Sequence, residues 1–392
     1  MQFRTIANAV EREGELIQEY ISKKAEEILE THGFSAEGKV LDSNKGWTPG
    51  FEPSAIAEEP KSFGSEQRNL EKEFQTALGK AFESNKEQSP EMKPGSITED
   101  EIMKAIEDLN AGKEKELQVD RSELHETFED PQSIKANISL DDVLAKKQKE
   151  SNREKYSPSK AKKAYVKNTV AHLQNGENAP YILNAPCIEK MMILVLAFLL
   201  KNGLLNRTGQ LIFFMDGAAD LCSAIQHLFA NILSFKIVLD WFHLEKKCKE
   251  RLSTGMKGKI IRNKVLAHIT PLLWHGKVEA VIAYLQGLNE DDIKNQDEIK
   301  RLIGYFERNR SFISCYALRQ KLGLRVSSNQ GEKANDLVVS SRQKLNFMSW
   351  STSGSTSLAT VTSIHLNNEQ SHWLLNHEIT FQFKKSEEKA AA

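Results

Sequence analysis

The sequence predicts an α/β fold, with a mixed β-sheet flanked by helices, interrupted by an all-helical insertion and preceded by a mainly helical N-terminal region. Two observations carry this prediction. Residues 210–243 hold two short apolar runs on either side of a segment with helical periodicity, which indicates a strand, a helix and a strand. Residues 244–322 have apolar groups at helical spacing and no clear strand pattern.

Length and composition indicate a globular protein with two or three domains. The chain has 392 residues, of which 40% are hydrophobic and 27% charged, and its net charge is −1. The longest apolar run, 191–200, is too short to span a bilayer. The first residues lack the apolar core of a signal peptide, so we expect a cytoplasmic protein with no membrane segment. The four cysteines form no CxxC pair, which argues against a disulfide framework or a zinc finger.

Residues 1–130 are predicted to be mainly helical. Apolar side chains recur at helical spacing through 3–31, whereas the Pro- and Gly-rich stretch 46–64 breaks the pattern. Residues 65–84 again have helical character, and a capping sequence precedes a short helix at 99–109. The position of this region before the core is compatible with DNA binding, but its charge does not require it.

Residues 131–243 are predicted to form the first part of the core. Three segments are interpreted as the strands of an antiparallel meander, namely 134–142, 165–173 and 181–183. A strongly apolar helix at 187–205 follows, and then the strand–helix–strand unit, with strands at 211–215 and 235–239. This order of elements is that of an RNase H-like core, a mixed sheet with helices on both faces.

The remainder of the chain divides into three parts. Residues 244–324 are predicted to form the helical insertion, and residues 325–375 the C-terminal part of the core, with a helix at 331–345. Residues 376–392 are predicted to be a tail, disordered from Phe381 onward.

Three acidic positions are candidates for one metal site. Asp141 or Asp142 lies on the first strand, Asp216 ends a later strand, and Glu332 begins a late helix. The carboxyl ends of parallel strands meet at one edge of a sheet, where active sites form. Carboxylates are the ligands that Mg²⁺ prefers, and two Mg²⁺ ions roughly 3.5–4 Å apart can clamp the attacking and leaving oxygens of a phosphoryl transfer.

Simpler interpretations of the aspartates remain open at this level. Asp216 could form a turn with Gly217 and serve only as the N-cap of the next helix. Asp240 could cap the helix expected near Leu244, and the pair Asp141-Asp142 could be a solvated strand end.

Two further alternatives concern the third acid and the only histidine near these motifs. Asp336 lies one turn after Glu332 and is the rival third acid. His243 could be a half-buried packing residue, like Trp241. With Cys222 and Cys248 it could suggest zinc, but the spacing matches no closed zinc site.

Five segments together resemble a known protein family. In chain order they read ISLDDVLAKKQKE, LIFFMDGA, VLDWFHLEKKCKE, SSNQGEKANDLVVSSRQK and MSWSTSGS. They resemble bacterial insertion-sequence transposases of the ISKra family, with ISLre-type and Mutator-like transposases as more distant relatives. The resemblance covers residues 134–373.

The resemblance implies an RNase H-like catalytic core with a DDE triad and an all-helical insertion between the second Asp and the Glu. By position, the triad falls on Asp141, with Asp142 as a close competitor, Asp216 and Glu332. These residues would hold two Mg²⁺ ions, with Mn²⁺ as a substitute. The Cys/Asp-x-x-His motif of such transposases corresponds to Asp240 and His243.

The resemblance further implies the activity and partners of a DDE transposase, which cleaves DNA at element ends and uses the released 3′-OH to attack target DNA. We expect a homo-oligomer on DNA, associated with the bacterial nucleoid while bound. The alternative is a catalytically inactive or domesticated descendant that binds DNA. A cellular RNase H-like nuclease or resolvase would explain neither the Asp-x-x-His motif nor the insertion. Basic residues are candidates for contacts with DNA phosphates, namely Lys146, Lys147, Lys149, Lys246, Lys247, Arg342 and Lys344.

Three positions depart from the family pattern. We expect a small residue at Leu144, where leucine would crowd the active-site strand, and a bulkier residue at Gly331, where glycine would loosen the helix that carries Glu332. We expect Gly at Phe347, where a turn would otherwise be strained. The cysteine-bearing N-terminal DNA-binding motif of some relatives is missing.

Overall fold

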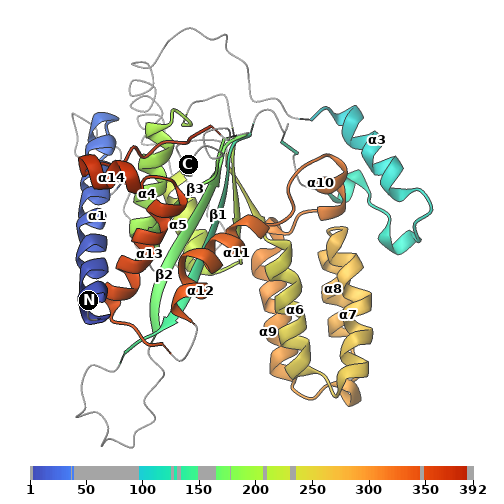
Figure 1. Ribbon diagram of the computed structural model, residues 1–392. Helices are drawn as coiled ribbons and strands as arrows, with labels where there is room; N and C mark the ends of the chain where they lie inside the picture. Colours follow the sequence, from blue (N-terminus) through green and yellow to red (C-terminus); the bar gives the residue numbers. More distant parts are fainter. Residues whose placement is uncertain are drawn as a thin grey trace, which may run out of the picture.

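A five-stranded mixed sheet forms the centre of the molecule (Figure 1). The structure, a computed structural model, describes residues 3–36, 38, 97–124, 128–129, 134–148, 165–176, 178–205, 210–229, 235–344 and 348–385. The strands follow the order β3-β2-β1-β4-β5 across the sheet. Their bounds are β1 Ile134–Lys146, β2 Tyr165–Gln174, β3 Tyr181–Ala185, β4 Gln210–Met215 and β5 Phe235–Leu239.

The directions of the strands follow the sequence pattern. β1, β2 and β3 pair as an antiparallel meander, whereas β4 lies parallel to both β1 and β5. β4 is buried on both faces, which explains its continuous apolar run. The predicted meander and strand–helix–strand unit are therefore confirmed, and the fold is α/β with a mixed sheet and flanking helices.

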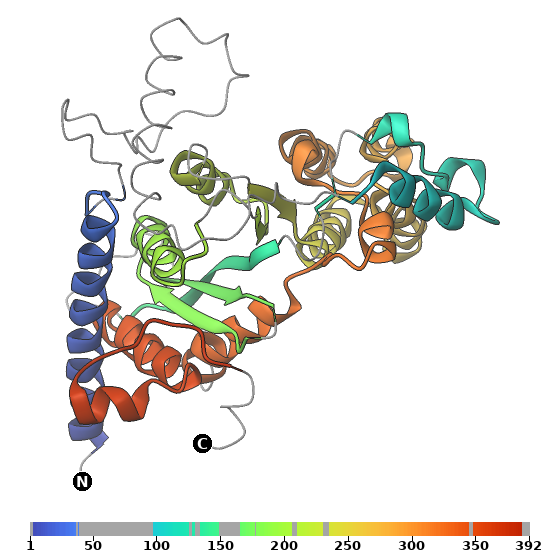
Figure 2. The same ribbon diagram turned by 90° about the horizontal axis from the view of Figure 1, so that it is seen from above.

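Helices cover both faces of the sheet (Figure 2). α4 (Ile188–Lys201) and α5 (Ala219–Phe229) pack with even-numbered β1 residues such as Ile138. α13 (Thr352–Leu366) and the helical segment 329–343 pack with odd-numbered β1 residues such as Val143. Successive side chains of a strand point to opposite faces, so Asp141 lies on the face of segment 329–343 and Asp142 on the other.

The segment that carries Glu332 is one helical run with a change of pitch. α11 spans Asn329–Asn335, a π-helical turn follows at Asp336–Ser340, and α12 spans Ser341–Gln343. It begins before the predicted 331–345 helix, so Glu332 lies inside α11 and not at its start. π-turns occur mostly inside α-helices and are frequent at functional sites.

The segment between β5 and α11 is helical, as predicted. Its helices are α6 Trp241–Gly255, α7 Lys259–Trp274, α8 Val278–Gln286, α9 Gln296–Asn309 and α10 Tyr316–Lys321. Two 3₁₀ turns, Glu290–Asp292 and Arg310–Phe312, complete it. Within the continuously described residues 241–321 there is no β-strand. These helices share a core with Ile212, Phe214 and Val238 of the sheet.

The described parts of the N-terminal region lie at two ends of the molecule (Figure 1). α1 (Phe3–Thr31) packs on α13 and α4. α3 (Glu99–Asn110) begins with the predicted capping box of Thr98 and Glu101 and packs beside α10. Short 3₁₀ turns follow at Lys115–Leu117 and Arg121–Glu123. The helix expected at 65–84 lies outside the described residues.

The C-terminal tail differs from the prediction. α14 (Gln370–Asn376) is followed by an ordered segment in which Phe381 is 1% exposed and contacts the rings of Tyr181 and Phe198. Disorder from Phe381 onward was therefore wrong for 381–385, because an aromatic side chain inside the polar tail completes the core; residues 386–392 lie outside the described residues. Among the described helices, none has the length and apolarity needed to cross a membrane.

Candidate active site

Three side chains from distant parts of the chain converge beside the sheet. Asp141 of β1, His243 of α6 and Glu332 of α11 each offer one ligand-type atom, and these atoms all lie within 4.8 Å of one another. Nε2 of His243 lies 2.5 Å from Oε1 of Glu332. Among the described residues this is the one group of three or more acidic, His or Cys side chains with such spacing.

Asp216 faces the same cavity without joining this group. The parallel register pairs Ser139 with Phe214, and continuing it by two residues places Asp216 beside Asp141 on one face of the sheet. Both aspartates line a cavity of about 420 Å³. Oδ1 of Asp216 also accepts a 2.8 Å hydrogen bond from the backbone N–H of Ala218, so the turn-forming role is present together with the position in the cavity.

Asp142 is committed to other partners. Its Oδ1 accepts a 2.6 Å hydrogen bond from the hydroxyl of Thr169, and its Oδ2 lies 2.6 Å from Nζ of Lys167. Lys167 also approaches Asp220 of α5, on the opposite face of the sheet. Asp141 is therefore the β1 acid that joins His243 and Glu332.

A close approach between α11 and β1 positions Glu332. Gly331 is buried, and a Cβ at this position would lie 2.7 Å from Cβ of Ser139. The expectation of a bulkier residue at Gly331 does not suit this structure, because a side chain would push α11 away from β1. The expectation that Leu144 crowds the strand was wrong, since its side chain is 47% exposed. Phe347 lies outside the described residues.

Asn335 is a member of the site that the sequence pattern did not single out. Its Nδ2 donates a 2.6 Å hydrogen bond to Oδ2 of Asp141, and the residue is 5% exposed. Its spacing of three residues from Glu332 was the available signal, because such positions are neighbours on a helix surface. Asp336, the rival third acid, lines the cavity but is not in the group of three.

The electrostatics of the group reflect its burial. Burial raises the pKa of Asp141 to about 7; the charges of Asp216 and Glu332 reinforce the rise, and that of His243 opposes it. Burial opposes protonation of His243, but its hydrogen bond to Glu332 and the nearby carboxylates raise its pKa overall. The hydrogen bond from His243 lowers the pKa of Glu332 despite burial. A cation is thus favoured in the middle of three carboxylates.

Asp240 holds two segments of the site together. It is fully buried and is the N-cap of α6, with Oδ1 accepting from the backbone N–H groups of Phe242 (2.8 Å) and His243 (3.2 Å). Its Oδ2 accepts from the backbone N–H of Ser328, at the start of α11. The cap interpretation was right, although α6 begins at Trp241. Trp241 itself packs against the rings of Trp274 and Tyr316.

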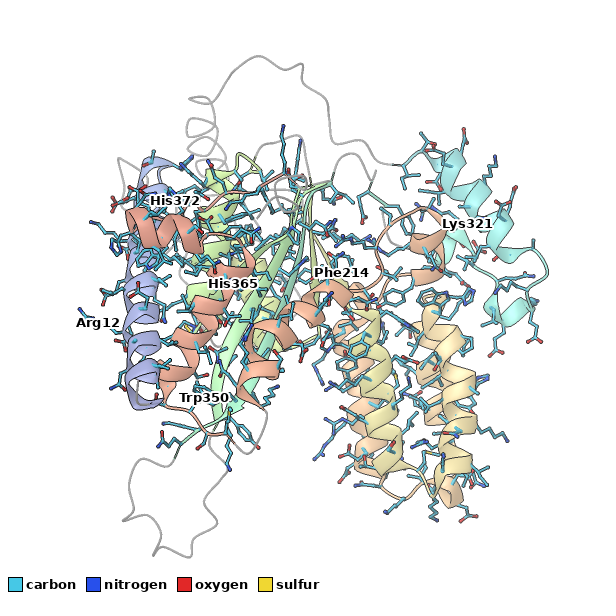
Figure 3. All side chains as sticks on the ribbon, in the orientation of Figure 1. Arg12, Phe214, Lys321, Trp350, His365 and His372 are labelled. Atoms are coloured by element: carbon cyan, nitrogen blue, oxygen red, sulfur yellow. The ribbon has the colours of Figure 1, made fainter. Side chains whose placement is uncertain are left out.

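The predicted basic residues fall into separate groups. Lys246, Lys247 and Lys344 line the cavity. Lys146 lies roughly 17 Å from Asp141 along β1, and Lys147 follows it. Both lysines are beside Trp350, at the lower end of the sheet (Figure 3). Arg342 is not among the described residues that line the cavity, and Lys149 lies outside the described residues.

The cysteines do not support a zinc site. Cys248 is buried in the core of the helical insertion, and Cys222 packs with α4 and α5 on the other side of the sheet. Burial raises the pKa of Cys222 to about 11 and that of Cys248 to about 12, which disfavours the thiolate needed for ligation.

The donor set fits a divalent cation. Carboxylate oxygens from three chain segments face one cavity and are hard ligands suited to Mg²⁺ or Mn²⁺. A scan of protein-family models and searches of curated proteins and of solved structures found no match to this chain. The assignment of function therefore rests on the arrangement of the side chains.

Proposed function

We propose that this protein is a DDE-type transposase, which cleaves DNA at the ends of an insertion sequence and then uses the released 3′-OH to attack a phosphodiester of the target DNA, displacing the target's own 3′-oxygen. The observation that carries the proposal is the convergence of Asp141, Asp216 and Glu332 on one cavity from β1, the end of β4 and α11. The mixed sheet, its element order and the helical segment between Asp216 and Glu332 are compatible with an RNase H-like core that has an inserted domain.

Each side chain has a defined task in this proposal. Asp141, Asp216 and Glu332 would hold two Mg²⁺ or Mn²⁺ ions, which would supply activation of the attacking water or 3′-OH and stabilisation of the leaving oxygen. Asn335 fixes the orientation of the Asp141 carboxylate through its hydrogen bond. His243 contacts Glu332 at the cavity wall and helps to hold its carboxylate in place.

Basic side chains complete the proposed site. Lys246, Lys247 and Lys344 line the cavity and suit the backbone of the DNA strand, because ammonium groups neutralise phosphate charge. Assembly as a homo-oligomer on DNA belongs to the same proposal.

A second candidate is a DNA-binding descendant that no longer cleaves. The contacts of His243 with Glu332 and of Asn335 with Asp141 favour it, because each already pairs one carboxylate oxygen of the acid within the protein. The two candidates differ in one measurable property, the cleavage of element-end DNA in the presence of a divalent cation.

The test compares Asp216→Asn with Asp336→Asn. Asn keeps the size of Asp and the turn-forming oxygen but removes the charge that a metal requires. We expect Asp216→Asn to reduce Mg²⁺-dependent cleavage of DNA from the flanks of the coding region by at least about 10²-fold, with binding at fixed salt unchanged or tighter. Asp336→Asn makes the same change in the same cavity and should retain most activity.

The outcomes separate the two candidates. Full activity of Asp216→Asn removes Asp216 from the catalytic set. A wild-type protein that binds the DNA but cleaves it with neither Mg²⁺ nor Mn²⁺ is the inactive descendant.

A further inference from the structure

A basic groove lies between two helices of the insertion, next to the candidate active site. It has a volume of about 720 Å³ and is lined by residues of α6, α9 and the turn after β4. The helices α6 and α9 lie side by side (Figure 1). Five cations line it, namely Lys247, Arg251, Lys300, Arg301 and Arg308. Two carboxylates, Asp216 and Asp297, are the acidic residues among its lining side chains.

We propose that this groove is a binding track for the sugar-phosphate backbone of the DNA that enters the active site. The inference rests on the proposed function, because it assigns the path of the same DNA. It adds a binding surface on α9 that neither the sequence motifs nor the family resemblance identified.

The groove is continuous with the candidate active site. Asp216 and Lys247 line both the groove and the cavity that contains Asp141 and Glu332. The hydroxyl of Tyr305 on α9 donates a 3.0 Å hydrogen bond to the carbonyl oxygen of Asp216, so the wall of the groove is attached to the active-site strand. A strand of DNA in the groove thus reaches the cavity without leaving the protein surface.

The cations of the groove fall into two groups according to their charged neighbours. Glu298 lies 2.7 Å from Arg251 and 2.6 Å from Arg301 and holds both guanidinium groups in place. Lys300 and Arg308, in contrast, form no ion pair with any residue that the structure describes. These two residues stand about 12 Å apart along the helix axis, at 1.5 Å per residue. That length covers about three steps of the 3.4 Å phosphate rise along one DNA strand, so both cations can contact one backbone.

Gly304 lies beside the guanidinium of Arg308 at the groove. It lies within α9, where glycine is less favourable than alanine. A Cβ there would lie 3.2 Å from Nη1 of Arg308, so the missing side chain leaves space for this guanidinium over the groove. The glycine thus favours an open basic groove and not a packed helix surface.

The test measures DNA binding as a function of salt, in EDTA so that no cleavage occurs. The double variant Lys300→Gln/Arg308→Gln should reduce the slope of log Kd against log salt by about 1.8, since each phosphate contact contributes about 0.9. The loss of affinity for a DNA duplex between about 50 and 200 mM salt should then be about tenfold smaller than in the wild type. Gly304→Gln changes no charge but fills the groove, and should weaken binding at every salt concentration.

The matched control is Lys259→Gln/Lys264→Gln. Both lysines are exposed on α7 of the same insertion, outside the groove, so the change in charge is identical. An unchanged slope in the groove variant, or an equal decrease in both variants, would overturn the inference.

If the proposed transposase activity is wrong, the experiments give a different result from the one expected if the groove proposal is wrong. A wild-type protein whose binding depends on the groove but which cleaves no DNA with Mg²⁺ or Mn²⁺ contradicts the transposase activity and leaves the track standing. A protein that cleaves DNA while the groove variant binds with the wild-type slope contradicts the track alone.

Discussion

At the scale of single residues, the site is a set of carboxylates with a histidine in the middle. His243 lies in contact with Glu332, and its charge also acts on Asp141. Because three carboxylates surround one imidazole, the metal-free site is most stable when His243 is protonated and Asp141 is neutral. The stability of the metal-free protein should therefore depend on pH.

The metal-free protein should become less stable as the pH rises through neutrality. Asp141 has a folded pKa of about 7, above its unfolded value of 3.8, so the folded state binds the extra proton between these values and its advantage disappears as the pH rises. The raised pKa of His243 acts in the same direction, since its contribution is present below the unfolded value and is lost above the folded one.

Asp141→Asn tests this effect. The variant should abolish cleavage yet raise the unfolding midpoint in EDTA at pH about 8 by several degrees, for a gain of roughly 1–3 kcal/mol. Thermal unfolding at several pH values measures it, with the exposed Asp291→Asn as control. Equal midpoints for wild type and Asp141→Asn across the neutral range would show that the carboxylate is not destabilised.

The sequence could predict the acids but not their partners. Asp141, Asp216 and Glu332 were predicted from the positions of acids at strand ends and at the start of a late helix, together with the family resemblance. The sequence placed the first acid on Asp141 with Asp142 as a close competitor, and the contacts of Asp142 with Lys167 and Thr169 separate the two. No periodicity reveals that an amide such as Asn335 will reach a neighbouring strand.

At the scale of elements, Asp240 couples the first helix of the insertion to the segment that begins α11. One carboxylate oxygen caps α6, and the other binds the backbone N–H of Ser328. His243 and Glu332 follow Asp240 and Ser328 by three and four residues, so the geometry of the site depends on a buried carboxylate that contacts the backbone N–H of His243 but neither functional side chain.

Asp240→Asn should separate the two roles. The amide oxygen can still cap α6, but the amide nitrogen cannot accept a hydrogen bond from Ser328, which costs roughly 1–3 kcal/mol because the N–H is buried. We expect cleavage to fall and the Mg²⁺ concentration for half-maximal activity to rise.

Asn295→Ala provides the comparison. Asn295 caps α9, away from the carboxylates, by accepting a hydrogen bond from Asp297. Its loss should lower stability by about 1 kcal/mol with no change in the Mg²⁺ requirement. If Asp240→Asn likewise lowers stability without changing the Mg²⁺ requirement, Asp240 acts only as the N-cap of α6.

Element patterns were predictable to different degrees. Period-two and helical spacing found the strands and the helix at 3–31, because burial on one face selects apolar residues. The π-turn at 336–340 and the contact of Gly331 with Ser139 were not predictable, since they depend on how a helix meets a strand distant in sequence.

At the scale of the whole molecule, long-range polar contacts attach the insertion to the sheet. The hydroxyl of Tyr316 donates a 2.8 Å hydrogen bond to the carbonyl oxygen of Leu239, and Tyr305 makes the corresponding contact with Asp216. Both contacts are at the ends of the parallel strands, so the groove on α9 and the carboxylates keep a fixed relation. Helical periodicity predicted the insertion, but it carries no information about these attachments.

A buried carboxylate of the N-terminal region, Glu129, forms ion pairs with the insertion and with the sheet. Glu129 lies 2.6 Å from Arg319 of α10 and 3.4 Å from Lys236 of β5, and the side chains of Glu129 and Arg319 are 0% and 1% exposed. Burial opposes ionisation of Glu129, but the charges of Arg319 and Lys236 outweigh it and lower its pKa. Its contribution to stability is therefore present above the ordinary carboxyl pKa and is lost as the pH falls through the lowered value.

Glu129→Gln should reduce the free energy of unfolding by about 3–5 kcal/mol at neutral pH, because it leaves a buried guanidinium without its counter-charge. Denaturant unfolding measures the loss, and Glu123→Gln is the control: its pair with Lys277 is 60% exposed on the glutamate side, so its removal should cost at most about 1 kcal/mol. The variant should also lose the acid-dependent part of the unfolding curve that ionised Glu129 contributes. Similar losses for the two variants would mean that water reaches Arg319, so that the Glu129 pair adds no more than an exposed ion pair to the apolar contacts of residues such as Phe128 and Leu318.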